Sequence, residues 1–154
     1  MQMSHAHPKT TDISDANEGK LQYVQPGFKD YGGRKAFSGQ MVTVKVFEDN
    51  SLVRETLATP GNGRVLIVDG AASMNSALMG DQLGALAVKN GWTGIVVHGC
   101  VRDSADLAKL DLGIKAMATH PKRSRKEGQV KRDEALYFFG STFVPGEYLY
   151  ADED

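Results

Sequence analysis

The chain has 154 residues, which fits one domain of about 100–200 residues. Its 18 Lys and Arg and 19 Asp and Glu residues leave a formal net charge of −1, which argues against nucleic-acid binding through overall charge. With 41% hydrophobic and 24% charged residues, the composition is that of a folded globular domain and excludes general disorder. The 17 glycines exceed the roughly 11 that average usage would give, so this surplus calls for an explanation.

Cysteine content and the N-terminal segment predict a cytoplasmic protein. Cys100 is the sole cysteine, so no intrachain disulfide can form and a reducing compartment is expected. No apolar run reaches the roughly 18 residues of a membrane span, and residues 1–9 lack the apolar segment of a signal peptide. Residues 1–10 are predicted to be a flexible tail and residues 11–154 a single domain. His5 and His7 could hold a metal, but a mobile polar tail is the favoured interpretation.

The predicted elements begin with a short helix over residues 10–16, which Gly19 ends. Valine alternates with polar residues over residues 41–47, and this period of two predicts a half-buried strand. A second helix follows Asn50, because residues 52–57 repeat apolar side chains at helical spacing before Pro60-Gly61 ends it.

The middle of the chain predicts a parallel α/β arrangement. Residues 65–68 and 94–97 are short apolar runs, as expected for strands covered on both faces, and the second is predicted to end at Gly99. A helix over residues 81–90 lies between them, with Gly91 just after its end. Ser104 is predicted to cap another helix, which carries Leu107 and Leu110 and ends at Gly113. Strands alternating with helices are typical of parallel sheets.

The last part of the chain changes character after Pro121. A basic loop (KRSRK, residues 122–126) precedes short apolar segments at 136–139, 142–144 and 148–150, which predict antiparallel strands. A mixed α/β domain with a β-rich end is therefore expected.

Candidate binding residues cluster where the predicted strands end. Gly70, Gly80 and Gly99 could line a site there, although most such glycines only form turns. Asp81 begins a helix whose free N–H groups, near Gln82, Leu83 and Gly84, suit a carboxylate or phosphate, while a simple helix cap is the alternative role for Asp81. Neither GxGxxG nor GxxxxGK[ST] is present.

Arg102 and Asp103 follow the next strand. The Arg102 guanidinium offers a planar fork for a carboxylate, and Asp103 offers a hard oxygen ligand for Mg²⁺ or Mn²⁺. A salt bridge between them, with Asp103 capping the following helix, is the alternative.

His98 and Cys100 share one strand face, but no third group that could orient a nucleophile and base is evident, so a catalytic pair is disfavoured.

Asp81, twenty intervening residues and Arg102-Asp103 form a D-X20-R-D pattern that resembles the RraA-like family. This family takes its name from the regulator of ribonuclease activity A. It includes class II 4-hydroxy-4-methyl-2-oxoglutarate aldolases and oxaloacetate decarboxylases. The similarity extends over residues 12–154. The segments that carry it are YGGRKAFSGQ, TVKVFEDN, GRVLIVDG, NGWTGIVVHGCVRD, LDLGIKAMATHP and PGEYLYADED.

The resemblance implies a three-layer β/β/α swivelling-domain fold, assembled as a homotrimer or hexamer with pockets between subunits. It implies a divalent metal, Mg²⁺ with Mn²⁺ as the alternative, held mainly by Asp103. Arg102 would contact the pyruvyl part of a 2-oxo acid, and Asp81 would assist proton transfer or orient water. The backbone amides of Gly80, Asp81, Gln82 and Leu83 would take the substrate carboxylate.

The activity implied is that of a lyase that cleaves a C–C bond of a 2-oxo acid to give pyruvate enolate. Family members often read DGGGS where this chain has Ala71-Ala72 within residues 69–73, and the two alanines are expected to narrow the pocket. The sequence ends at Asp154 without the C-terminal extension of longer aldolases, which favours decarboxylase over aldolase activity. The alternative function is a non-catalytic regulator that binds ribonuclease E, supported by the basic residues 122–126. No direct nucleic-acid partner is expected.

Overall fold

The computed structural model describes residues 7–128 and 131–154. Most of the predicted tail, residues 1–6 with His5, lies outside the described residues. The helices are α1 (Thr10–Ala16), α2 (Ser51–Leu57), α3 (Asp81–Lys89) and α4 (Ser104–Leu107). The strands are β1 (Lys29–Asp30), β2 (Phe37–Lys45), β3 (Val65–Asp69), β4 (Ala77–Met79), β5 (Gly94–Val101), β6 (Gly113–Thr119), β7 (Leu136–Phe138), β8 (Ser141–Phe143) and β9 (Tyr148–Ala151).

One large sheet organises the molecule, with strand order β1-β6-β5-β3-β2-β9 and β4 paired to β5. The pairs β2–β3, β3–β5, β4–β5 and β5–β6 are parallel, and β1 and β9 run antiparallel at the two edges. The parallel α/β arrangement predicted for the middle of the chain is therefore confirmed. The predicted antiparallel strands are also present, since β7 pairs with β8 and β9 pairs with β2.

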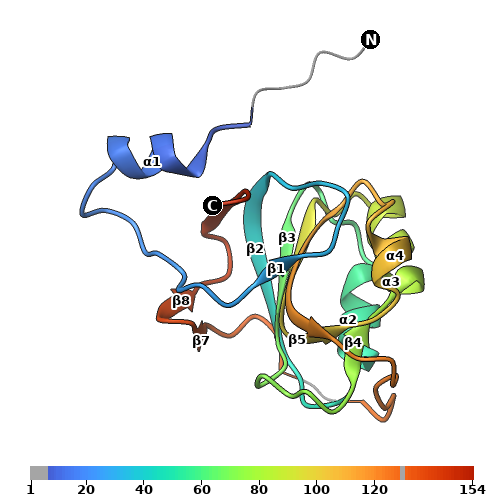
Figure 1. Ribbon diagram of the computed structural model, residues 1–154. Helices are drawn as coiled ribbons and strands as arrows, with labels where there is room; N and C mark the ends of the chain where they lie inside the picture. The colour runs from blue at the N-terminus through green and yellow to red at the C-terminus, as the bar shows by residue number, and fades with distance from the viewer. Residues whose placement is uncertain (1–6, 129–130) are drawn as a thin grey trace.

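The sheet is covered on both faces (Figure 1). Helices α2, α3 and α4 lie on one side, and the small β7–β8 sheet lies on the other. Strand β3 shows the consequence for side chains, because its residues alternate between two cores. Leu66 and Val68 belong to the cluster under the helices, whereas Val65 and Ile67 belong to the cluster under β7 and β8. The layers are thus helices, large sheet and small sheet, which confirms the β/β/α order.

Two glycines of the surplus make room for one aromatic ring. A Cβ atom on either Gly94 or Gly113 would collide with the ring of Phe37, which is fully buried. Phe37 begins β2, while the two glycines begin the paired strands β5 and β6. The ring therefore packs directly on the backbone of both strands, and a larger residue at either glycine would displace it.

Several predicted boundaries were wrong because tertiary pairing extends or shortens the elements. β2, predicted over residues 41–47, spans Phe37–Lys45, since residues 37–40 pair with β9. β5 continues past Gly99 to Val101, since Val101 pairs with both β4 and β6. The helix from Ser104 ends at Leu107, and Gly113 begins β6 instead of ending a helix. Strand β4 was not predicted, because three residues are too few to show a period.

Helix α1 projects from the body and has no buried residues (Figure 1). Thr10, placed in the predicted tail, begins this helix and ties it to the C-terminus: its N–H and hydroxyl donate to the carboxylate of Asp152 at 2.8 and 2.7 Å. His7 also contacts the body, through the hydroxyl of Ser38 at 3.0 Å. No helix in the described part of the chain is long and apolar enough to cross a membrane.

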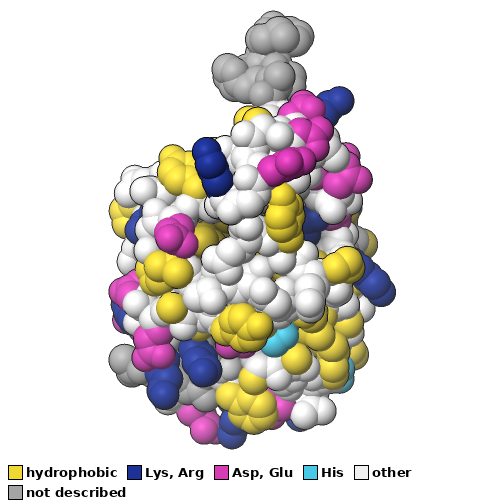
Figure 2. All heavy atoms as spheres, turned by 90° about the vertical axis from the view of Figure 1, so that its left-hand side faces the viewer, with side chains coloured by type: hydrophobic (Ala, Val, Ile, Leu, Met, Phe, Trp, Pro, Cys, Tyr) yellow, Lys and Arg dark blue, Asp and Glu magenta, His cyan; other side chains and the backbone are white. Residues whose placement is uncertain are grey.

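Figure 2 shows the face that carries β7 and β8, where hydrophobic side chains gather around a histidine. Exposed hydrophobic residues of the described chain include Tyr137 on β7 and Tyr148 on β9. Because hydrophobic side chains gather on this face, it is a candidate contact surface.

Candidate active site

The candidate site lies where β4 and β5 end beside the start of α3. Strand β4 ends at Met79 and is followed at once by Gly80, while β5 ends at Val101 and is followed by Arg102. The N–H of Arg102 donates to the carbonyl oxygen of Met79 at 2.9 Å, which holds the two strand ends together. The D-X20-R-D residues, distant in sequence, therefore meet at one edge of the sheet, where ligands of open α/β sheets bind.

Asp103 has a left-handed backbone, with φ 58° and ψ 43°, a conformation that Asp tolerates better than most residues. Its Oδ2 accepts the N–H of Asp81 at 3.1 Å and lies 3.8 Å from Nε of Arg102. Its side chain is 30% exposed, and Oδ1 has no hydrogen-bond partner within the described residues. The carboxylate is thus fixed through one oxygen and open at the other.

Of the alternative roles as helix caps, that of Asp81 was wrong, whereas Asp103 does occupy the cap position of α4, before Ser104, but without a side-chain cap bond. Asp103 gives no side-chain cap to its own helix α4, and its carboxylate instead accepts from the first N–H of α3. The cap position of α3 belongs to Gly80, and Asp81 is the first helical residue, with an exposed side chain. The salt bridge between Arg102 and Asp103 is present, although at 3.8 Å it is long.

Gly80 is required by the close approach of Asp103. A Cβ atom at this position would collide with Oδ2 of Asp103 and would lie 2.9 Å from Cγ of Arg102. Gly70 and Gly99, expected to border the same pocket, do not line it. A Cβ atom on Gly70 would meet Leu78 and the backbone of His98. Of the three glycines, Gly80 alone lines the cavity described below.

The first turn of α3 offers two free N–H groups. The N–H of Asp81 is occupied by Asp103, and the N–H of Gly84, predicted to be free, donates to the carbonyl oxygen of Gly80 at 3.0 Å. Gln82 and Leu83 have no backbone hydrogen-bond acceptor among the described residues. These two groups, at the positive end of a nine-residue helix, are suited to bind an anion.

All six predicted site residues line one cavity of about 230 Å³. Its other lining residues were not predicted as site residues: Asn50, Arg54, Ala77, Met79, Arg123 and Lys126. The cavity holds four cationic side chains against the two carboxylates of Asp81 and Asp103, so it favours anions. The KRSRK motif was the signal for Arg123 and Lys126, but nothing in the sequence connected that loop to the D-X20-R-D residues.

The residues present fit a cation of the Mg²⁺ type better than a transition metal. No group of three or more His, Cys, Asp and Glu side chains is placed to hold a metal in the described part of the chain. Asp103 nevertheless offers an open carboxylate oxygen inside the cavity. Mg²⁺ commonly binds through one or two carboxylates and completes its shell with water and substrate oxygens.

Cys100 and His98 do not form a catalytic pair. Nδ1 of His98 bonds to Oδ1 of Asp69 at 3.0 Å, and its ring stacks on Phe138 with centroids 4.3 Å apart. Cys100 is buried with its sulfur 3.3 Å from that of Met74, and burial raises the pKa of its thiol. A buried thiol without a base is inert as a nucleophile.

The Ala71-Ala72 segment does not narrow the cavity, since neither residue lines it. Both alanines have left-handed backbones, with φ of 56° and 58°. The N–H of Ala71 donates to Asp69 at 2.9 Å, and that of Ala72 donates to the carbonyl oxygen of His98 at 3.1 Å. The loop is therefore held against β3 and β5.

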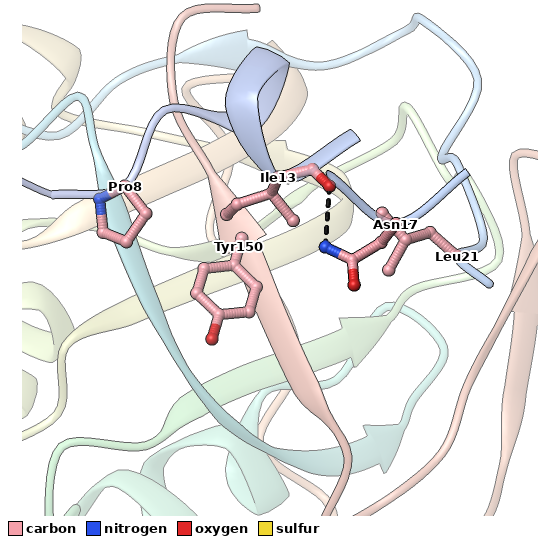
Figure 3. A pocket seen from close by; sticks show the side chains of 5 residues that line it. All are labelled: Pro8, Ile13, Asn17, Leu21 and Tyr150. Carbon is pink, nitrogen blue, oxygen red and sulfur yellow. Dashed lines mark hydrogen bonds between the residues drawn. The ribbon is translucent and has the colours of Figure 1, made fainter. Parts of the chain in front are cut away.

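A second cavity, of about 290 Å³, lies between α1 and β9 (Figure 3). Its lining side chains are those of Pro8, Ile13, Asn17, Leu21 and Tyr150. The amide of Asn17 donates to the carbonyl oxygen of Ile13 at 2.8 Å. This cavity is mostly apolar and contains neither a carboxylate nor a cation, so it offers no catalytic chemistry.

Comparison with known proteins identifies the family. The model of the RraA-like family, described as Aldolase/RraA, matches residues 10–154. A protein of Laribacter hongkongensis named "Putative 4-hydroxy-4-methyl-2-oxoglutarate aldolase" is 57% identical over 145 residues, which cover 94% of this chain and 91% of that protein. A protein of Alkalilimnicola ehrlichii with the same name is 56% identical, with 94% and 90% covered. The chain belongs to the RraA-like family.

Two solved structures share the fold closely. The RNA-processing inhibitor RraA from Thermus thermophilis superposes with a TM-score of 0.92 at 44% identity, covering 96% of this chain and 89% of that one. A structure described as an S-adenosylmethionine:2-dimethylmenaquinone methyltransferase from Geobacillus kaustophilus gives 0.93 at 46% identity, covering 95% and 91%. Proteins of this fold thus carry names from three functional classes, and the site itself must separate them.

Proposed function

We propose that the protein is a divalent-metal-dependent lyase that cleaves a C–C bond of a 2-oxo acid to give pyruvate enolate. 4-Hydroxy-4-methyl-2-oxoglutarate is the substrate for aldol cleavage, and oxaloacetate is the substrate for decarboxylation. The observation that carries this proposal is the convergence of Arg102, the open carboxylate of Asp103 and the free N–H groups of α3 on one cavity. The names of the relatives support the aldolase class.

The substrate's 2-oxo carboxylate binds at the start of α3. The N–H groups of Gln82 and Leu83 donate to it, and the helix dipole favours its negative charge by about 0.3–1 kcal/mol. Arg102, which lines the same cavity, adds a fork of N–H donors. Two fixed sets of donors orient the 2-oxo group relative to Asp103.

Asp103 is the residue that would hold a divalent cation, Mg²⁺ with Mn²⁺ as the alternative, through its open oxygen. When bound, the cation stabilises the negative charge that develops on the substrate's carbonyl oxygen. Arg102 contributes to the same stabilisation, because its positive charge lies beside Asp103 within the cavity.

Both reactions break the bond between C3 and C4, and its electron pair remains on the pyruvyl part as enolate. In decarboxylation C4 leaves as CO₂, whereas in aldol cleavage the C4 hydroxyl loses its proton and C4 becomes a carbonyl. Asp81, whose carboxylate is exposed and has no partner within the described residues, accepts or returns the proton directly or through water. Protonation at C3 then gives pyruvate.

The decisive experiment measures pyruvate release from oxaloacetate with Mg²⁺, with and without chelator, against the rate with free metal alone. We expect Asp103→Asn to lower kcat/KM by about 100-fold or more, because the substituted amide removes the charge that attracts the cation. Lys109→Gln, a change of an exposed residue outside the cavity, is the matched control. Equal rates with and without protein, or an Asp103→Asn variant as fast as the parent, would exclude the lyase function.

Assembly as a homotrimer or hexamer, with pockets between subunits, is part of the proposal. The hydrophobic side chains on the face shown in Figure 2 support a contact between copies. Sedimentation of the pure protein measures this, and a monomer of about 17 kDa at micromolar concentration would contradict it.

The second candidate function is inhibition of ribonuclease E, supported by the similarity to the RNA-processing inhibitor RraA and by the exposed basic residues 122–126. This function predicts slower RNA cleavage by ribonuclease E when the protein is added, also with Asp103 replaced. Absence of a complex at micromolar concentration would exclude it.

A further inference from the structure

The cavity has a basic end that the proposed reaction does not yet use. It consists of Arg54 on α2 with Arg123 and Lys126 in the loop after β6. None of these three side chains has an ion-pair or hydrogen-bond partner among the described residues. Cations that line a cavity without partners repel one another, and an anionic ligand relieves that repulsion.

The basic loop is held in place before any ligand binds. The N–H of Ala77 donates to the carbonyl oxygen of Lys122 at 2.8 Å, and the hydroxyl of Ser124 donates to the carbonyl oxygen of Ala77 at 2.7 Å. On the other side, the N–H of Asn50 donates to the carbonyl oxygen of Arg125 at 3.0 Å. Ser124 is buried, so the loop is anchored to both β4 and the start of α2.

Asn50 is the second observation that points to a ligand. It lines the cavity and is only 7% exposed, yet its Oδ1 is buried without a hydrogen-bond partner. An unsatisfied buried acceptor costs about 1–3 kcal/mol, so a ligand that brings a donor is favoured here. A hydroxyl group supplies that donor, and the aldol substrate carries one where oxaloacetate does not.

We propose that Arg54 and Arg123 bind the distal carboxylate of the substrate and thereby favour aldol cleavage over decarboxylation. The inference rests on the lyase function proposed above. In aldol cleavage the distal carboxylate keeps its charge from substrate to product, so ion pairs with it are retained throughout. In decarboxylation the distal carboxylate itself becomes neutral CO₂, and cations that stabilise its charge raise the barrier. This preference for aldol cleavage is the reverse of the preference for decarboxylation that the sequence predicted.

Binding of two matched acids tests the basic end directly. 2-Oxoglutarate and 2-oxopentanoate have five carbons and the same 2-oxo carboxylate, and they differ in a terminal carboxylate against a methyl group. With Mg²⁺ present, calorimetry should show 2-oxoglutarate binding about tenfold or more tightly to the parent protein. In the double variant Arg54→Gln/Arg123→Gln this advantage should fall to about twofold or less, with the affinity for 2-oxopentanoate unchanged.

A second readout separates binding from chemistry. The double variant should lose about tenfold in kcat/KM for aldol cleavage, whereas kcat for oxaloacetate should stay constant or rise. Lys109→Gln removes one exposed charge outside the cavity. It should change neither the ratio of the affinities for the two acids nor the ratio of the rates of the two reactions. Both arginines are exposed, so circular dichroism should show the parent fold.

Equal affinities of the parent for the two acids, no binding of either acid, or an advantage that persists in the double variant would overturn the inference. So would an equal loss of kcat in both reactions. Failure of the lyase function is a different result: the parent would then discriminate between the two acids but release no pyruvate above the rate with free metal.

Discussion

Two aspartates near the ends of neighbouring parallel strands differ in burial and in how many hydrogen bonds their carboxylates accept. Asp69 ends β3, is 8% exposed, and its Oδ1 contacts both Nδ1 of His98 at 3.0 Å and the N–H of Ala71 at 2.9 Å. Asp103 follows β5, keeps one oxygen open and lies in the cavity. Each carboxylate keeps one oxygen without a hydrogen-bond partner among the described residues, but the Asp69 side chain is 11% exposed and lies outside the cavity, whereas that of Asp103 is 30% exposed and lines it. Asp69 is therefore called the closed aspartate and Asp103 the open one.

The difference separates a carboxylate that serves the fold from one that is available to a ligand. Burial opposes ionisation of Asp69, but hydrogen bonds from His98 and Ala71, with the positive charges of His98 and Lys45, outweigh it and lower the pKa of this carboxyl. All of these interactions of Asp69 are with other groups of the protein. At Asp103 a left-handed backbone and an open carboxylate oxygen coincide in one residue that lines the cavity, which makes it a candidate functional residue.

The largest expected effect comes from Gly80→Ala, which breaks the arrangement around the open aspartate. The new methyl group collides with Oδ2 of Asp103, so the carboxylate must shift. We expect kcat/KM for pyruvate release to fall about 100-fold, because small displacements of a catalytic group have effects of this size. Steady-state kinetics at saturating Mg²⁺ measures the loss. Activity within threefold of the parent would show that the position of Asp103 is not critical.

The next effect concerns the closed aspartate. Asp69→Ala leaves His98 and the N–H of Ala71 without their acceptor, and we expect the free energy of unfolding to fall by about 2 kcal/mol. Urea denaturation measures this. The control Asp111→Ala removes an exposed salt bridge with Arg34 and should change stability by less than about 0.5 kcal/mol. A loss as small as that of the control would make Asp69 dispensable for the fold.

Acid should weaken the fold through Asp69 and Asp152. Burial opposes ionisation of Asp152, but hydrogen bonds from Thr10 and the N–H of Asp154 outweigh it, so its pKa is lowered as well. Groups with a lowered folded-state pKa stabilise the protein above the unfolded value of about 3.9, and this contribution is lost as pH falls through the folded value. The free energy of unfolding should therefore decline below about pH 4, and less steeply in Asp69→Asn. Identical slopes of the free energy of unfolding against pH in the parent and in Asp69→Asn would contradict this.

The smallest expected effect is a gain. Ala72 has a left-handed backbone that glycine adopts without strain, so Ala72→Gly should raise the free energy of unfolding by up to about 1 kcal/mol. Ala85 lies exposed within α3, where Ala85→Gly should lower it by about 1 kcal/mol. Thermal unfolding should show that the same substitution stabilises the protein at residue 72 and destabilises it at residue 85. Changes in stability of the same sign would refute the conformational argument.

Local patterns predicted most of the fold. Continuous apolar runs identified β3 and the start of β5, because both faces of these strands are covered and every residue from Val65 to Val68 is buried. Strand β4 and the end of β5 were missed, since both depend on pairing between segments far apart in sequence. Local residue type cannot show which distant strand supplies the hydrogen bonds.

Some residues of the candidate site could likewise be predicted from local sequence, and others could not. Helix position and spacing indicated Asp81, Arg102 and Asp103, and the family resemblance brought these residues together. Arg54 and Arg123 could not be found from sequence, because their place in the cavity depends on the anchoring of the basic loop to Ala77 and Asn50. Side chains delivered by irregular loops have no periodic signal in the sequence.

The hydrogen bond from the Asp81 N–H to Asp103 has a thermodynamic consequence. The helix proposed to offer N–H groups to a substrate carboxylate is tied to the carboxylate proposed to offer an oxygen to a cation. The N–H groups of α3 and the open oxygen of Asp103 are therefore held at a fixed separation once the chain has folded. Under the proposed function, part of the entropy that a loose site would lose on binding a cation and an acid is therefore already lost on folding.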